Sequence, residues 1–256
     1  MISARLAGAY VETLFSLKKY SSNLATVQKA DKILSLLPPQ IGPYPQHPFF
    51  SERATQFTQE ILTYKGPTSN LSINFGDSLV DMWRDRFTSI NIPMSVGGMH
   101  HYQMLQMAQV IKPILDARKL VPKYIMIGTL GGNPLLQHQE INSVIQKSID
   151  CLNGLRILWP NPQIKMIVYG LPPVIALYAT IHSLEFEAAI YKWVVSDPNS
   201  VFIPMFKSFA GKWGIYPKTW CTADGVHLSP VGQVMLDERF ERAKTELPRT
   251  LLDYTE

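Results

Sequence analysis

From residue 71 onward, short apolar runs alternate with longer stretches in which apolar residues recur every three or four positions. The first pattern is typical of strands buried on both faces, and the second of amphipathic helices. The predicted strands span residues 71–75, 93–96, 124–130, 164–169 and 201–204, and the predicted helices span 79–87, 99–118, 138–158, 174–194 and a last stretch from about 229. This alternation predicts an α/β fold, a three-layer sandwich with a parallel five-stranded sheet between helices.

The first 68 residues have a different pattern of apolar and polar positions. Two helical patterns, over 4–20 and 24–37, precede a proline-rich connector, and a third helical pattern covers 52–64. Proline cannot continue a helix, so the connector separates the two parts. We expect a helical N-terminal extension over residues 1–68, which could bind a protein partner, followed by the main domain over 69–256.

Composition indicates a folded globular chain, since 46% of the residues are hydrophobic and only 17% are charged. The net charge of +4 lies mostly in the first 68 residues, without a dense basic cluster, so nucleic-acid binding is not expected. The apolar segment 6–17 is interrupted by Glu12 and ended by Lys18 and Lys19, which favours an amphipathic helix over a signal peptide or a transmembrane helix. We therefore expect no transmembrane segment and, by default, a cytoplasmic protein.

A first candidate for chemistry lies at the end of the first predicted strand, in the string Asn-Phe-Gly-Asp-Ser-Leu over 74–79. Ligands of open α/β sheets bind outside the carboxyl ends of the strands. The hydroxyl of Ser78 is therefore expected at a cleft, with its backbone N–H at a helix N-terminus. The alternative is that Ser78 only caps the helix.

A second candidate precedes the last predicted helix, where Asp224 stands three residues before His227 on a short loop. A carboxylate at this spacing can orient the imidazole and stabilise its charged form. Serine is a weak nucleophile at neutral pH and needs such a base. The alternative for His227 is a structural role.

Two glycine-containing loops also follow predicted strands. Gly131, Gly132 and Asn133 follow the third strand, and Gly97 and Gly98 follow the second. The Asn133 amide could donate to an oxyanion, and a glycine lets a backbone N–H approach a ligand closely. A simple turn remains the alternative for each.

Neither a metal nor a cofactor is expected. The glycines form no dinucleotide-binding or phosphate-binding fingerprint. His100 and His101 are adjacent, so they point in different directions on a helix, and no acid or thiol cluster accompanies them. Cys151 and Cys221 are too few for a disulfide framework.

In order and spacing, Gly-Asp-Ser-Leu at 76–79, the glycine pair at 97–98, Gly-Gly-Asn at 131–133 and Asp-Gly-Val-His at 224–227 resemble the four sequence blocks of the SGNH hydrolase superfamily, also called GDSL esterases and lipases. The resemblance covers residues 70–246. It implies a flavodoxin-like sandwich and a catalytic triad of Ser78, Asp224 and His227. It also implies an oxyanion hole made of Ser78, Gly98 and Asn133, with Gly98 preferred to Gly97.

The implied function is a serine ester hydrolase that works through an acyl-enzyme, on a short acyl ester, an acetylated sugar, a lysophospholipid-type ester or a thioester. Trp213, Tyr216 and Trp220 could line its pocket or pack in the core. One departure is Pro134, which stands where the family usually has Asp. The alternatives are a non-catalytic scaffold that keeps the fold and an acyltransferase that uses the same triad.

Overall fold

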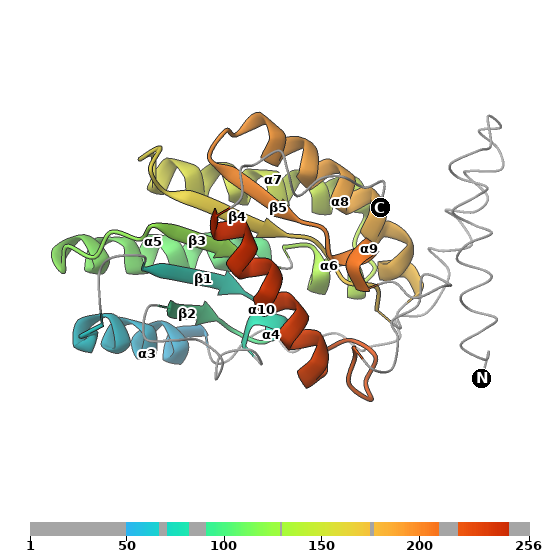
Figure 1. Cartoon of the computed structure of the whole chain (residues 1–256), viewed down its shortest axis with the longest axis horizontal. Helices are drawn as coiled ribbons and strands as arrows, with labels where there is room; N and C mark the ends of the chain where they lie inside the picture. Colours follow the sequence, from blue (N-terminus) through green and yellow to red (C-terminus); the bar gives the residue numbers. More distant parts are fainter. Residues whose placement is uncertain are drawn as a thin grey trace.

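A parallel sheet of five strands forms the centre of the computed structural model, which describes residues 50–66, 71–81, 91–128, 130–174, 177–209 and 220–245 (Figure 1). The strands are β1 (Ser72–Gly76), β2 (Asn91–Ser95), β3 (Tyr124–Ile127), β4 (Lys165–Tyr169) and β5 (Ser200–Ile203). Their order in the sheet is β2-β1-β3-β4-β5, and every neighbouring pair is parallel. The predicted α/β sandwich is confirmed.

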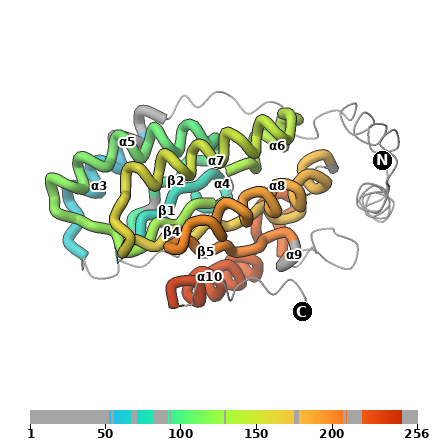
Figure 2. The backbone as a smooth tube through the Cα atoms, turned by 90° about the horizontal axis from the view of Figure 1, so that it is seen from above, coloured from blue at the N-terminus to red at the C-terminus, as the bar shows by residue number. Residues whose placement is uncertain are grey.

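Helices cover both faces of this sheet (Figure 2). The helices are α3 (Phe50–Thr63), α4 (Ser78–Asp81), α5 (His101–Ala117), α6 (Gly132–Leu136), α7 (Ile141–Leu158), α8 (Leu177–Ser196), α9 (Met205–Phe209) and α10 (Pro230–Thr245). One face is covered by α3, α5, α7 and α8, and the opposite face by α4, α9 and α10.

Successive residues of a strand point into opposite layers, which explains why β3 reads as an unbroken apolar run. In β3, Ile125 and Ile127 pack against the α5 and α7 side, whereas Tyr124 and Met126 pack against the α10 side. All four are buried. A strand buried on both faces needs no polar alternation, although β1 does alternate the buried polar Ser72 and Asn74 with Ile73 and Phe75.

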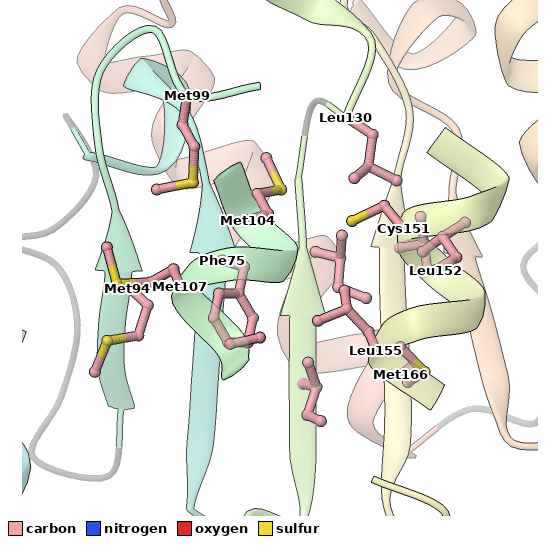
Figure 3. Close-up of a cluster of buried hydrophobic side chains, with 14 of the residues drawn as sticks. Phe75, Met94, Met99, Met104, Met107, Leu130, Cys151, Leu152, Leu155 and Met166 are labelled. Carbon is pink, nitrogen blue, oxygen red and sulfur yellow. The ribbon is translucent and has the colours of Figure 1, made fainter. Parts of the chain in front are cut away.

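Methionines fill much of the layer between α5 and the sheet (Figure 3). Met94 of β2 and the helical Met104 and Met107 are fully buried around Phe75 of β1. The thioether side chain is flexible and adapts to irregular gaps between a helix and a sheet.

Helix α3 belongs to the same hydrophobic core, although the sequence places it within the expected extension. Its Phe57 and Ile61 are fully buried in the core cluster shared with β1, β2 and α5. We therefore propose that any separate N-terminal unit ends before Phe50. The helices predicted over 4–20 and 24–37 and the proline-rich connector lie outside the described residues.

Two short helices, α6 and α9, were not predicted, because five residues give too few turns for a recognisable periodicity. The helix predicted from 138 begins at Ile141, after a turn in which His138 has a φ of 59°.

Pro134 is the third residue of α6, and the first turn of a helix needs no N–H at that position. The departure from the family pattern is therefore compatible with the helix.

Within the part of the chain that the structure describes, none of the helices has both the length and the apolar character needed to cross a membrane.

We expect Phe57→Ala to lower the free energy of unfolding of the main domain by about 3–5 kcal/mol, because it leaves a cavity in the shared core. Urea unfolding followed by circular dichroism measures this change. Gln59→Ala, on the exposed side of the same helix, is the matched control and should leave the midpoint almost unchanged. An equal response of the two variants would contradict the assignment of α3 to this core.

Candidate active site

Ser78 lies at the carboxyl end of β1, as the first residue of α4. The cap of α4 is Asp77, whose Oδ1 accepts a hydrogen bond of 3.0 Å from the backbone N–H of Leu79. Gly76 allows the tight turn, since a Cβ there would lie 2.1 Å from a methyl carbon of Val80. Asp77 therefore serves as the cap, and the Ser78 side chain is left to face His227.

The loop that carries Asp224 and His227 is closed by backbone hydrogen bonds. The N–H of Thr222 donates to the carbonyl of His227 over 2.8 Å, and Cys221 and Leu228 form an antiparallel bridge. Gly225 has a φ of 68°, in the left-handed region that glycine adopts without strain. The loop thus returns on itself directly before α10 and holds both side chains at the same edge as Ser78.

The structure brings the three residues of the predicted triad together in a chain of hydrogen bonds. Nε2 of His227 lies 2.9 Å from Oγ of Ser78, and its Nδ1 lies 2.6 Å from Oδ2 of Asp224. An ionised Asp224 accepts from Nδ1–H, which leaves the lone pair of Nε2 facing the serine hydroxyl. This arrangement can draw a proton from Ser78 as the hydroxyl attacks an electrophile.

Asp224 is held ionised by its own loop. Partial burial alone would raise the pKa of its carboxyl, but hydrogen bonds from Thr222, His227 and Val226 outweigh that effect and place the pKa below its ordinary value. The Thr222 hydroxyl donates to Oδ1 over 2.6 Å. Sequence reasoning missed Thr222, and its position two residues before Asp224 is the signal that could have found it.

The glycine loop after β2 passes directly beside the serine. A Cβ built on Gly97 would lie 3.7 Å from Cβ of Ser78, and Gly98 is buried with a φ of 76°. That φ favours glycine at position 98, whereas position 97 has ordinary space for a methyl group. The structure therefore places the glycine pair beside Ser78.

Asn133 reaches the same place from α6 and is buried. Its Nδ2 donates to the carbonyl of Met99 over 3.1 Å and to Oδ2 of Asp77 over 3.3 Å. The amide is thus fixed between the glycine loop and the turn before Ser78. Sequence reasoning gave Asp77 no role, although it is buried and contacts both α4 and Asn133.

A small hollow of about 370 Å³ of empty space, its open mouth included, adjoins the serine. Apart from the polar Asp77, Ser78, Asn133 and Ser183, its walls are glycine or apolar. The remaining lining residues are Leu79, Gly132, Leu136, Leu171, Pro172, Val174, Ala179 and Val226. Such a surface suits an apolar group rather than a charged one.

One wall of this hollow is held by a buried glutamate that sequence reasoning missed. Oε1 of Glu187, on α8, accepts from the backbone N–H groups of Met205 and Phe206 over 2.7 and 2.9 Å. The N–H of Leu171, which lines the hollow, also donates to this carboxyl group. The available signal was its place on the apolar face of α8, three residues before Ile190 and seven before Val194.

The other candidates do not line the hollow or lie outside the described residues. Trp220 packs against Phe209 with ring centroids 5.8 Å apart, so it contributes to the core and does not line the hollow. Trp213 and Tyr216 lie outside the described residues. Within the described ranges, no three His, Cys, Asp or Glu side chains cluster in a way that could hold a metal ion.

No protein-family model matches the chain, and no curated protein matches it by sequence. A candidate acylhydrolase of Bacteroides fragilis superposes with a TM-score of 0.60 at 17% identity, over 74% of this chain and 94% of that chain. A GDSL-like lipase of Bacteroides thetaiotaomicron gives 0.58 at 16% identity, over 76% and 99%. A lipase from a goat rumen metagenome gives 0.51 at 17% identity, over 68% and 97%.

The chain therefore has the fold of GDSL-like lipases and acylhydrolases. The resemblance drawn from the four sequence blocks is confirmed at the level of the fold.

Burial raises the pKa of Glu187 to about 8, against the lowering effect of its three backbone hydrogen bonds. The folded protein therefore keeps a proton that the unfolded chain loses near the ordinary glutamate pKa. Between these two pKa values the folded state binds more protons, so this group makes stability fall as pH rises. We expect Glu187→Gln to remove that slope.

Melting temperatures of wild type and Glu187→Gln at intervals from pH 5 to 8 measure the effect. The variant should gain on wild type as pH rises, by about 2–4 °C for each kcal/mol of difference. Glu241→Gln, which changes a glutamate with a 66% exposed side chain, is the control and should follow wild type. A Glu187→Gln curve parallel to wild type would contradict the assignment.

Proposed function

We propose that this protein is a serine hydrolase that cleaves carboxylic esters. The observation that carries the proposal is the continuous chain from Ser78 Oγ through His227 to the Asp224 carboxylate, with contacts of 2.9 and 2.6 Å. The similarity of the fold to a GDSL-like lipase and a candidate acylhydrolase supports it. A serine nucleophile, a base and a neutral oxyanion donor together suit attack on the carbonyl group of an ester.

The proposed reaction proceeds through an acyl-enzyme. Nε2 of His227 takes the proton of Ser78 as Oγ attacks the ester carbonyl, and the resulting imidazolium gives this proton to the departing alcohol. Water then attacks the acyl-enzyme while His227 takes a proton from it, and the acid leaves as Ser78 regains its hydrogen. Asp224 keeps the imidazole in one orientation throughout.

We further propose that the oxyanion is held by the backbone N–H groups of Ser78 and Gly98 and by the side chain of Asn133. Gly97, next to Gly98, lies beside Ser78, and Asn133 lines the same hollow. The Asn133 amide makes two hydrogen bonds. The longer one, 3.3 Å to Asp77, is the one that an oxyanion would replace. Charge that develops on the carbonyl oxygen strengthens such a bond in the transition state.

The hollow beside Ser78 is the proposed acyl site. Leu79, Leu136, Leu171 and Val226 present only hydrocarbon to it, so the acyl group is expected to be apolar and uncharged. Its enclosed space is only about 20 Å³, which favours short acyl groups over long chains. Short p-nitrophenyl esters are therefore suitable first substrates.

We expect Ser78→Ala to lower kcat/KM for p-nitrophenyl butyrate by about 10⁴- to 10⁶-fold, because the nucleophile is lost while the fold is kept. Steady-state hydrolysis is measured together with a fluorophosphonate probe, and mass spectrometry locates the adduct. Wild type should carry one adduct, on Ser78, and the variant none. Ser183→Ala, which changes another serine of the same hollow, is the control and should keep the adduct. Equal hydrolysis by wild type and Ser78→Ala would refute the mechanism.

The glycine pair offers a matched test of the oxyanion site. Gly98→Ala forces a φ of 76° on a residue with a Cβ, so the loop shifts and its N–H is misplaced. We expect kcat to fall by about 10²-fold, as for loss of one oxyanion donor, with little change in KM. Gly97→Ala makes an ordinary contact with Ser78 and should lower kcat by less than roughly threefold, or about 0.6 kcal/mol. Equal losses in both variants would argue against Gly98 as the donor.

A further inference from the structure

The hollow beside Ser78 is too small to enclose most acyl chains. Its enclosed space of about 20 Å³ admits roughly one water-sized group, since a cavity of about 10–15 Å³ already holds one water. A single methyl group fills such a space, whereas each further methylene of an acyl chain has to lie in the open mouth. The contacts that fix the walls of this hollow therefore decide which acyl groups react well.

One wall is the strip of residues 171–174 that follows β4, here called the 171–174 wall. Leu171, Pro172 and Val174 line the hollow. The strip belongs to no helix or strand, so its backbone groups have no repeating ladder of their own. Its position depends on the neighbouring elements, and chiefly on α8, which adds Ala179 and Ser183 to the same hollow.

Thr180 of α8 holds the C-terminal end of the 171–174 wall. Its hydroxyl accepts a hydrogen bond of 3.0 Å from the N–H of Val174 and donates to the carbonyl of the same residue. A hydroxyl has one donor and two acceptor positions, so it can make both bonds at once. Thr180 is itself 4% exposed, which fixes the hydroxyl within the packed helix.

Glu187 holds the other end of this wall, because its carboxyl group accepts from the N–H of Leu171. Thr180 and Glu187 stand seven residues apart, which is about two turns, so they lie on one face of α8. Between the two attachment points are Pro172 and Pro173, whose rings fix φ. A stiff strip that is tied at both ends can move away from α8 only where one end is released.

We propose that Thr180 is a specificity-determining positioning residue, which keeps the 171–174 wall against α8 and thereby limits the preferred acyl group to about two carbons. This inference rests on the proposed ester hydrolysis and deepens it. Thr180 does not line the hollow, so it acts through Val174 and not on the reacting atoms.

Loss of the hydroxyl has a defined consequence for the wall. It removes the hydrogen bonds that α8 gives to the N–H and the carbonyl of Val174. Because Val174 is only half-buried, these groups can turn towards water instead of staying unsatisfied, and the side chain moves with them. The hollow then lengthens and accepts longer acyl chains.

The test compares kcat/KM of the full chain for p-nitrophenyl acetate, butyrate and hexanoate, with the rate of Ser78→Ala subtracted as background. Wild type should hydrolyse the acetate at least about tenfold faster than the hexanoate, with the butyrate between them, because methylenes outside the enclosed space gain little contact. The readout is the ratio of the acetate value to the hexanoate value, which a general loss of folded protein does not change.

Two substitutions of Thr180 separate its hydroxyl from its shape. Thr180→Val keeps a side chain of similar shape without the hydroxyl, and we expect it to lower the acetate-to-hexanoate ratio at least about fivefold. Thr180→Ser keeps the hydroxyl and should hold the ratio within about twofold of wild type.

Two further variants address the wall and the helix. Val174→Ala trims the wall itself and should shift the ratio in the same direction as Thr180→Val. Since Val174 is half-buried, this variant decides the question even where Thr180→Val fails to fold. Val194→Ala is the control, because Val194 is buried on α8 but does not line the hollow, and it should leave the ratio within about twofold of wild type.

Three results would overturn this inference alone. They are a wild type that hydrolyses the hexanoate as fast as the acetate, an unchanged ratio in both Thr180→Val and Val174→Ala, and an equal shift in Val194→Ala. A wild type that hydrolyses none of the three esters and takes no fluorophosphonate adduct on Ser78 would instead refute the proposed function, and this inference with it.

Discussion

The parallel alignment of the five strands is the constraint on which the rest of the structure depends. Because every pair in the sheet is parallel, the carboxyl ends of the strands share one edge. Ser78, Gly98 and Asn133 follow β1, β2 and β3 at that edge, and the loop before α10 adds His227. Residues separated by 149 positions in sequence thus meet within 2.9 Å through the topology of the sheet.

The same topology leaves buried backbone N–H groups that need hydrogen-bond acceptors. Where β4 and β5 end, backbone N–H groups turn away from the ladder in a region too buried for water to solvate them. Glu187 satisfies three of these groups with one side chain, at the expense of burying a carboxyl group. Burial of this carboxyl group raises its pKa, and its hydrogen bond from Leu171 holds one wall of the hollow beside Ser78.

The sequence predicted the five strands and the residues of the candidate triad, because buried strands and end-of-strand motifs are local signals. It did not predict α6 or α9, whose five-residue lengths show no periodicity. Helix α3 was assigned to an extension, since the proline-rich connector before it is visible in sequence whereas the burial of Phe57 depends on packing. Thr222 and Glu187 were missed for a related reason, because their roles arise from backbone groups brought near by folding.

The hydrogen bonds of Asn133 bear on how the proposed site would favour the transition state. Its amide already donates to Met99 and Asp77, so a neutral ester carbonyl has to compete with a carboxyl oxygen for the same N–H. A neutral carbonyl is the weaker acceptor, whereas the oxyanion formed by attack of Ser78 carries a full charge. An interaction made in the transition state and withheld from the substrate raises kcat rather than merely lowering KM. The internal bond to Asp77 would thus hold the Asn133 amide in place before the reaction, and its loss in the transition state would offset part of the stabilisation gained from the oxyanion.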